Sequence, residues 1–215
     1  EFLAFLPRDS QGLELADDWS GFGQRTTGSG TVKLHRVPVA AEDVIPFSTA
    51  FSEPTLVGPF AQIMHAAIET GIARAAFEET LVRVRQARPW IDSGVEHATD
   101  DPLTKLELGR IIADVRASEV LLKQAGRSID AARPQPTAES VAKASLDVAK
   151  VRAHSSETAL KASSKLIELA GSRGSQRADG LDRFWRNARV HTLHDASRWK
   201  YYFIANYFSV HDKNR

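Results

Sequence analysis

Residues 137–171 read TAESVAKASLDVAKVRAHSSETALKASSKLIELAG, and this stretch decides the fold class. Thr137 can cap the start of a helix with its hydroxyl, and Gly171 can end one because glycine tolerates a left-handed backbone. Between them the apolar residues recur at intervals of three or four residues, or sums of these intervals. This heptad-like spacing puts them on one helix face. The stretch therefore predicts one long amphipathic helix. Its apolar positions are Val141, Ala144, Val148, Val151, Ala162, Leu166 and Leu169.

Two further long helices are expected before this stretch and a broken one after it. Asp101-Pro102 supplies an N-cap and a first-turn proline for the second helix, which should end before Pro134. The last helix is expected around residues 181–189, is interrupted near His194-Asp195, and resumes through Trp199. Helices of this length with short connections predict an antiparallel four-helix bundle. The predicted apolar faces comprise Leu56, Phe60, Ile63, Ala67, Arg74, Phe77, Leu81 and Val84 on the first helix, and Leu108, Ile112, Val115, Leu122 and Ile129 on the second.

The residues before Pro46 have a different composition, rich in Gly, Thr and Val. Runs such as residues 2–6 and 31–39 alternate with turn-forming residues and predict strands. These strands are too few to cover their own faces, so we expect their partners in a preceding region and interpret the chain as a fragment. The predicted organisation is a partial β-domain at 1–46, a linker at 47–54 and a helical bundle domain at 55–215. The expected fold class is mainly α.

Composition excludes several classes of function. The 215 residues are 42% hydrophobic and 26% charged, as in an ordinary globular protein. A net charge of +1 gives no broad field to attract nucleic acid or an anionic membrane. The absence of cysteine excludes disulfides and thiol catalysis, and fits a cytoplasmic location. We see no signal peptide and no apolar run long enough to span a bilayer.

The densest group of chemically capable side chains is RFWRNARVHTLHD at residues 183–195. On a helix Arg186 and Arg189 share a face, as do His191 and His194 or Asp195, so these groups could converge on one anionic or redox-active ligand. A helix end capped by surface arginines and histidines is the alternative. The spacing His-x-x-His-Asp is common by chance and no further ligand group is visible, so we expect no metal site.

Three other stretches carry candidate binding residues. Residues 17–27, DDWSGFGQRTT, join aromatic rings to a glycine loop, where Trp19 could lie against a flat ring. Arg88 precedes Pro89-Trp90 and is well placed to grip a phosphate. Ser172 and Arg173 lie in a glycine-flanked turn that offers backbone donors. A turn with a core tryptophan, a surface loop and a simple helix C-cap are the respective alternatives.

Taken in this order, the motifs resemble the acyl-CoA dehydrogenase superfamily over essentially the whole chain, from the second half of its middle β-domain onward. The branch of dibenzothiophene monooxygenase and the sulfur-acquisition oxidoreductases is more similar still, with endings like WRNAR at 185–189 and TLHD at 192–195. The dehydrogenases carry a catalytic glutamate before Gly-Thr where this chain reads HDAS at 194–197. Asp195 would stand at the base position, one methylene short. The resemblance therefore favours the monooxygenase branch.

This resemblance implies catalytic roles for the residues near the chain's end. Reduced flavin, delivered by a separate flavin reductase, would react with O2 to give a C4a-(hydro)peroxide. His194 would form or stabilise that species, with His191 as a supporting neighbour and Asp195 beside it. FMN is the implied cofactor, and FAD is the other candidate.

The same resemblance implies that Trp19 lines the flavin and that Arg88 holds its phosphate from a neighbouring subunit. Ser172 and Arg173 would contact the cofactor. The implied substrate is a small sulfur-containing or aromatic molecule, the implied assembly is a dimer or tetramer, and the isolated fragment should be inactive. The alternatives are an acyl-CoA dehydrogenase and a non-catalytic oligomerising helical fragment.

Overall fold

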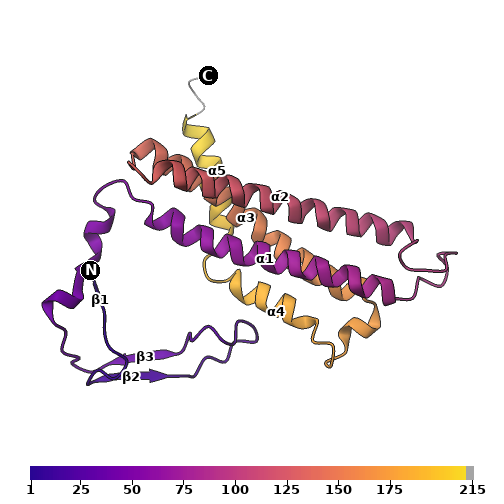
Figure 1. The fold of residues 1–215 in the computed structure, drawn as a ribbon, viewed down its shortest axis with the longest axis horizontal. Coiled ribbons are helices and arrows are strands. Elements are labelled where there is room, and N and C mark those ends of the chain that lie inside the picture. Colours follow the sequence, from indigo (N-terminus) through magenta and orange to yellow (C-terminus); the bar gives the residue numbers. More distant parts are fainter. Residues whose placement is uncertain (212–215) are drawn as a thin grey trace.

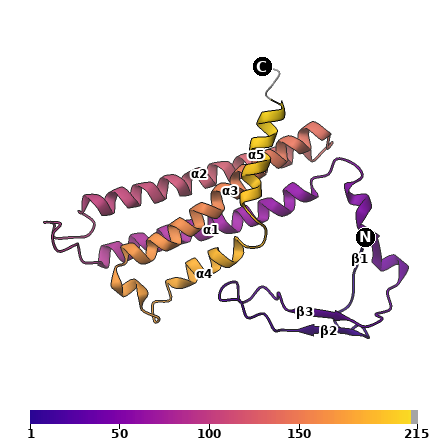
Figure 2. The ribbon, with the colours of Figure 1, turned by 180° about the vertical axis from the view of Figure 1, so that it is seen from behind.

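A computed structural model describes residues 1–211 of the chain. Three long helices lie side by side: α1 (Val57–Gln86), α2 (Pro102–Ala132) and α3 (Ala138–Leu169) (Figure 1). A short helix, α4 (Asp182–His191), packs against α1 and α3. The last helix, α5 (Arg198–His211), crosses α3 steeply and projects away from the bundle (Figure 2). Helix α3 contacts all four of the others and forms the centre of the helical part.

The sequence of α3 accounts for its central position. Thr137 accepts a hydrogen bond from the backbone of Ser140, whose side chain in turn accepts one from the backbone of Thr137, so the helix start is fully capped. Most of the predicted apolar face is buried, including Ala144, Val151 and Leu166 at 0% exposure. The predicted helix is confirmed, and its many alanines and serines let neighbouring helices approach closely.

The apolar face predicted for α1 is partly wrong. Phe60 is 57% exposed, and Ala67 and Arg74 also face solvent. The helix instead turns its small and polar side toward α3, because small side chains allow the two backbones to lie close together. The residues buried on that side are Pro59, Ala66, Glu69, Thr70, Ala73, Ala76, Thr80 and Val84.

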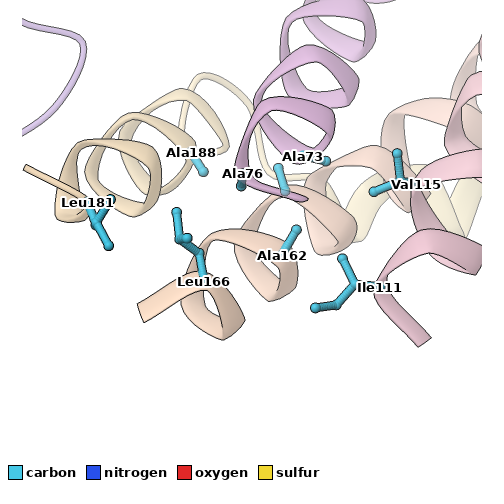
Figure 3. Close-up of a cluster of buried hydrophobic side chains, with 9 residues drawn as sticks. Ala73, Ala76, Ile111, Val115, Ala162, Leu166, Leu181 and Ala188 are labelled. Carbon is cyan, nitrogen blue, oxygen red and sulfur yellow. The ribbon is translucent and has the colours of Figure 1, made fainter. Parts of the chain in front are cut away.

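The hydrophobic core divides into two clusters along the bundle. One joins α1, α2, α3 and the start of α4 through Ile111, Val115, Leu166 and Leu181, with alanines between them (Figure 3). The second cluster comprises Ala66, Ala125, Ile129, Ala144, Val148 and Val151. Within residues 1–211 no helix is both long and apolar enough to cross a membrane.

The strands form two small antiparallel pairs in an arm beside the bundle (Figure 1). Strand β1 (Phe2–Ala4) pairs with β4 (Val44–Pro46), with Phe2 opposite Pro46. Strand β2 (Leu13–Ala16) pairs with β3 (Thr31–Leu34), with Leu13 opposite Leu34. Apolar strand residues stay largely open, because each of these sheets has only two strands.

The predicted interruption near His194-Asp195 is confirmed. Helix α4 ends at His191, residues 192–197 form turns, and α5 begins at Arg198. The fourth element of the bundle is therefore two short helices rather than one long one. The break brings His194 and Asp195 onto a connecting segment beside α1 and α3, where their side chains meet the residues described next.

Candidate functional site

A buried ion pair lies at the centre of the site. Glu69 of α1 and Arg152 of α3 are both 0% exposed, and Arg152 Nη1 donates to both carboxylate oxygens of Glu69. Ser156 and Ser155 donate to Glu69 Oε2 at 2.7 Å and 3.1 Å. A buried carboxylate is tolerated only when it is paired and hydrogen-bonded, and this one has four donors including His191.

Three histidines, His65, His191 and His194, extend from this ion pair toward the surface, and we call them the histidine cluster. His191, the last residue of α4, is 9% exposed, and its Nδ1 lies 3.1 Å from Glu69 Oε1. Its Nε2 lies 3.2 Å from Nδ1 of His65 on α1. The exposed ring of His194 stacks on His65 with centroids 3.9 Å apart. The cluster thus runs from a buried carboxylate to an imidazole in solvent.

Asp195 sits on the other side of Arg152. Its Oδ1 accepts from Arg152 Nη2 at 3.0 Å, and its Oδ2 pairs with Lys200 Nζ at 2.7 Å. Partial burial opposes ionisation of Asp195, but the hydrogen bond from Lys200 and the charges of Lys200 and Arg152 outweigh it and hold its pKa below the ordinary value. Asp195 is therefore an ionised structural partner of two cations.

At Glu69, too, burial and the neighbouring groups shift the pKa in opposite directions, whereas at His65 burial and most neighbouring charges shift the pKa in the same direction. Burial of Glu69 opposes ionisation, yet the hydrogen bond with His191 and the charge of Arg152 hold the Glu69 pKa below its ordinary value. At His65, burial lowers the pKa first, and the charges of His194, His191 and Arg152 lower it further, while Asp195 acts in the opposite direction. His65 is thus a neutral imidazole at pH 7.

The loop that carries Trp19 is docked onto α4. Asn187 Oδ1 accepts from the backbone of Gln24 at 2.9 Å, and Arg186 Nη1 donates to the carbonyl of Phe22 at 2.9 Å. Gly23 is buried there, and a Cβ on it would lie 2.1 Å from the Arg186 carbonyl oxygen, so the close approach requires glycine. Trp19 Nε1 donates to Gln24 O at 2.9 Å.

Trp19 lines a cavity of about 720 Å³ between this loop and the start of α4. Its walls include three arginines, Arg25, Arg177 and Arg186, and one carboxylate, Asp182, which pairs with Arg186 at 2.9 Å. A half-exposed indole beside cationic groups can hold a flat anionic ring system.

Arg88, Ser172 and Arg173 line one further cavity of about 860 Å³ where the C-terminal ends of α1 and α3 meet the start of α2, which we call the bundle-end cavity. Trp90 and Ile91 lie beside it and are 70% and 88% exposed. The structure therefore brings these three predicted cofactor residues together, but apart from the cavity of Trp19. This cavity is also lined by Arg83 and by the carboxylates Asp101, Glu168 and Asp179. Its capacity for a phosphate group therefore depends on the side chains of Arg88 and Arg173, which have no partner among the described residues, and not on a net positive charge.

Three residues of the site, His65, Glu69 and Arg152, are missing from the sequence-based prediction. His65 and Glu69 are four positions apart on α1, and Arg152 directly follows Val151 of the predicted apolar face of α3. A charged residue in the middle of a predicted buried stripe was the available signal, since such residues are rarely buried without partners. Across the described part of the chain, no three acidic or histidine side chains are grouped to hold a metal ion.

Known proteins of similar sequence indicate the family of this chain. The profile of the family "Acyl-CoA dehydrogenase, C-terminal domain" matches residues 63–199. A dibenzothiophene monooxygenase from Mycolicibacterium goodii is 33% identical over 95% of this chain and 52% of its own length. A probable FMNH2-dependent monooxygenase from Pseudomonas putida is 29% identical over 98% of this chain and 55% of its own length.

Among solved structures, the dibenzothiophene monooxygenase of Paenibacillus sp. A11-2 bound to FMN and indole superposes with a TM-score of 0.92 at 30% identity, over 98% of this chain and 56% of that one. The chain thus spans about half the length of the curated relatives it matches. Because the family profile covers most of the helical region and the fold agrees along nearly the whole chain, this chain belongs to the acyl-CoA dehydrogenase family and carries its C-terminal domain.

Proposed function

We propose that the chain forms part of a flavin-dependent monooxygenase that uses reduced FMN and O2 to oxidise a small sulfur-containing or aromatic molecule. The observation that carries the proposal is the difference between the adjacent residues His194 and Asp195. His194 is an exposed imidazole, whereas Asp195 is held by Arg152 and Lys200. The relatives named for dibenzothiophene oxidation support the substrate class.

The acyl-CoA dehydrogenase alternative requires Asp195 to remove a proton from carbon. A carboxylate whose pKa lies below its ordinary value is a weak base, and its two cationic partners would have to be displaced first. His194 has no such restraint, and an imidazole exchanges protons near neutral pH. The local electrostatics therefore favour proton transfer by His194.

Reduced FMN, when bound, would supply the two electrons with which one oxygen atom of O2 enters the substrate and the other leaves as water. In this proposal Trp19 lies along the ring system, Arg88 binds the phosphate from a neighbouring subunit, and Ser172 and Arg173 are further cofactor contacts. FAD could use the same residues. Because the flavin acts as a co-substrate, a separate flavin reductase would have to regenerate it.

The decisive experiment supplies the full-length protein with enzymatically reduced FMN, ¹⁸O2 and dibenzothiophene. We expect the product to gain one ¹⁸O atom per turnover, detected by mass spectrometry. Anaerobic reduction of oxidised flavin by an acyl-CoA thioester, without oxygen incorporation, would instead establish the dehydrogenase alternative.

We further propose that the protein assembles as a dimer or tetramer. The aromatic residues of α5 are largely uncovered, with Trp199 at 54%, Tyr202 at 57% and Phe203 at 56% exposure. Monomeric soluble proteins rarely leave several large aromatic side chains uncovered on one surface. Light scattering at micromolar concentration should give at least twice the monomer mass, and a monomer would contradict this assembly.

A further inference from the structure

The hydrogen bonds of the histidine cluster define where each proton lies. Glu69 is ionised, so it can only accept, and His191 must donate from Nδ1. The neighbouring charges already cancel, since Glu69 and Asp195 oppose Arg152 and Lys200. The tautomer of His191 with its single ring proton on Nδ1 leaves Nε2 to accept. His65 then donates from Nδ1, which leaves Nε2 of His65 without a proton.

The stacking of His65 on His194 adds a second constraint. Their ring centroids are 3.9 Å apart with planes inclined by 36°. Two imidazolium rings at this separation repel each other, and burial of His65 strengthens the repulsion because water screens it less. The groups that face His65 are Glu69 on its own helix, Arg152 on α3, His191 at the end of α4, and His194 with Asp195 on the following turn. The two rings can therefore carry at most one positive charge between them.

We propose that His65 is a positioning residue for proton transfer by His194: the Glu69–His191 pair fixes its tautomer, and its ring orients His194 and limits the two rings to one positive charge. The inference rests on the proposed function, because it assumes that His194 exchanges the proton. It assigns α1 a part in the chemistry that the sequence motif at 192–195 does not reveal.

The tautomers can be measured without any activity. In the full-length protein free of flavin, labelled with ¹⁵N-histidine, NMR at pH 8 should show His65 and His191 both protonated on Nδ1. Glu69→Gln should invert both, because the glutamine amide can donate to His191 Nδ1 while its oxygen still accepts from Arg152. If His65 carries its proton on Nε2 in the wild-type protein, the proposal is overturned.

A second variant, His191→Phe, tests the proposal independently in case Glu69→Gln does not fold. His191→Phe removes the hydrogen bonds of His191 to both His65 and Glu69, so His65 should shift toward the Nε2-protonated form that histidine prefers in water. An unchanged His65 signal in His191→Phe would show that His191 does not set the tautomer and would overturn the proposal.

The catalytic readout compares His65→Phe with His154→Phe. His154 is a half-buried histidine of α3 that bonds the Asp114 carbonyl and lies outside the cluster, so it is a matched control. His65→Phe keeps an aromatic ring beside His194, yet it should lower kcat roughly 10-fold to 100-fold and move the acid limb of the pH profile to higher pH, with FMN affinity unchanged. His154→Phe should match the wild type.

The outcomes separate this inference from the proposed function. If the protein does not oxygenate dibenzothiophene but the tautomers are as expected, the proposed function fails and the tautomer that the Glu69–His191 pair imposes on His65 stands. If it oxygenates normally while His65→Phe keeps the wild-type pH profile, the inference about His65 is wrong and the proposed function survives.

Discussion

At the histidine cluster each charged side chain has a partner inside the chain, whereas the side chains of Arg88 and Arg173 at the bundle-end cavity have no ion pair or hydrogen bond within residues 1–211. The first region is buried, and its carboxylates and cations cancel. The second is open, and the side chains of Arg88 and Arg173 in it have no partner in the described part of the chain, although Asp101, Glu168 and Asp179 also line it. This contrast suggests a division of labour, in which the paired region handles protons and the unpaired region binds an anion from outside.

The same contrast predicts different costs of mutation. A buried, paired charge contributes to folding because its loss strands its partner, while an exposed, unpaired charge can be removed with little effect on stability. Substitutions in the paired region should therefore lower the free energy of unfolding, as measured by denaturation curves. Substitutions in the bundle-end cavity should appear only in ligand binding.

The largest expected effect is on stability. Arg152→Leu leaves Glu69 buried without its cation and should lower the free energy of unfolding by about 3–5 kcal/mol, measured by urea denaturation. Arg116→Leu is the matched control, because Arg116 is 68% exposed in its pair with Glu119, and it should cost at most about 1 kcal/mol. The double variant Arg152→Leu/Glu69→Leu should recover part of the loss. Equal stability of Arg152→Leu and Arg116→Leu would contradict this view of the ion pair.

The next effect is on catalysis. His194→Ala should reduce oxygenation by roughly 100-fold, the usual scale for loss of a general acid or base, while flavin affinity changes little. Asp195→Asn should be milder, because it weakens the contacts to Arg152 and Lys200 and disturbs its neighbour only indirectly. Steady-state rates with reduced FMN would measure both. An inactive Asp195→Asn beside a nearly normal His194→Ala would make Asp195 the base.

Much of the fold was predictable because it depends on local signals. The caps Thr137 and Asp101 and the periodicity of α3 are properties of short segments, and the structure confirms both caps. The face of α1 was not predictable in the same way. Its packing side is chosen by how closely α3 approaches, so alanines and Glu69 are buried while the larger Phe60 is exposed.

The site was predictable only where its residues are adjacent in sequence. His191, His194 and Asp195 stand in one motif, but the residues that they contact, His65, Glu69 and Arg152, are separated from them in these contacts by 43 to 129 positions. Such contacts exist only after α1, α3 and α4 have packed together. Periodicity cannot reveal which polar residue meets which.

A smaller effect is expected at the bundle-end cavity. Arg88→Ala should weaken FMN binding by roughly 10-fold to 100-fold if its guanidinium holds the phosphate, since a charged hydrogen bond contributes about 1.5–3 kcal/mol. Arg173→Ala should act in the same direction, and both should leave urea denaturation within about 0.5 kcal/mol of the wild type. Arg85→Ala is the control, because Arg85 is exposed near the end of α1 but does not line the cavity. Isothermal titration with FMN would show whether Arg88 and Arg85 differ.

The smallest effect is a dependence of stability on pH that should originate at His65. Its pKa in the folded chain lies below the ordinary value of 6.5, chiefly because the ring is partly buried and faces His194, His191 and Arg152. Between the folded pKa and 6.5 the unfolded chain binds more protons, so stability is full above about pH 6.5 and declines as the pH falls. One group gives a slope of at most about 1.4 kcal/mol per pH unit. The lowered pKa values of Glu69 and Asp195 act in a separate window, below their ordinary values of 4.5 and 3.8. Urea denaturation at intervals from pH 8 to pH 5 should therefore show a decline that is shallower in His65→Phe, and identical slopes in the two proteins would mean that His65 is not its source.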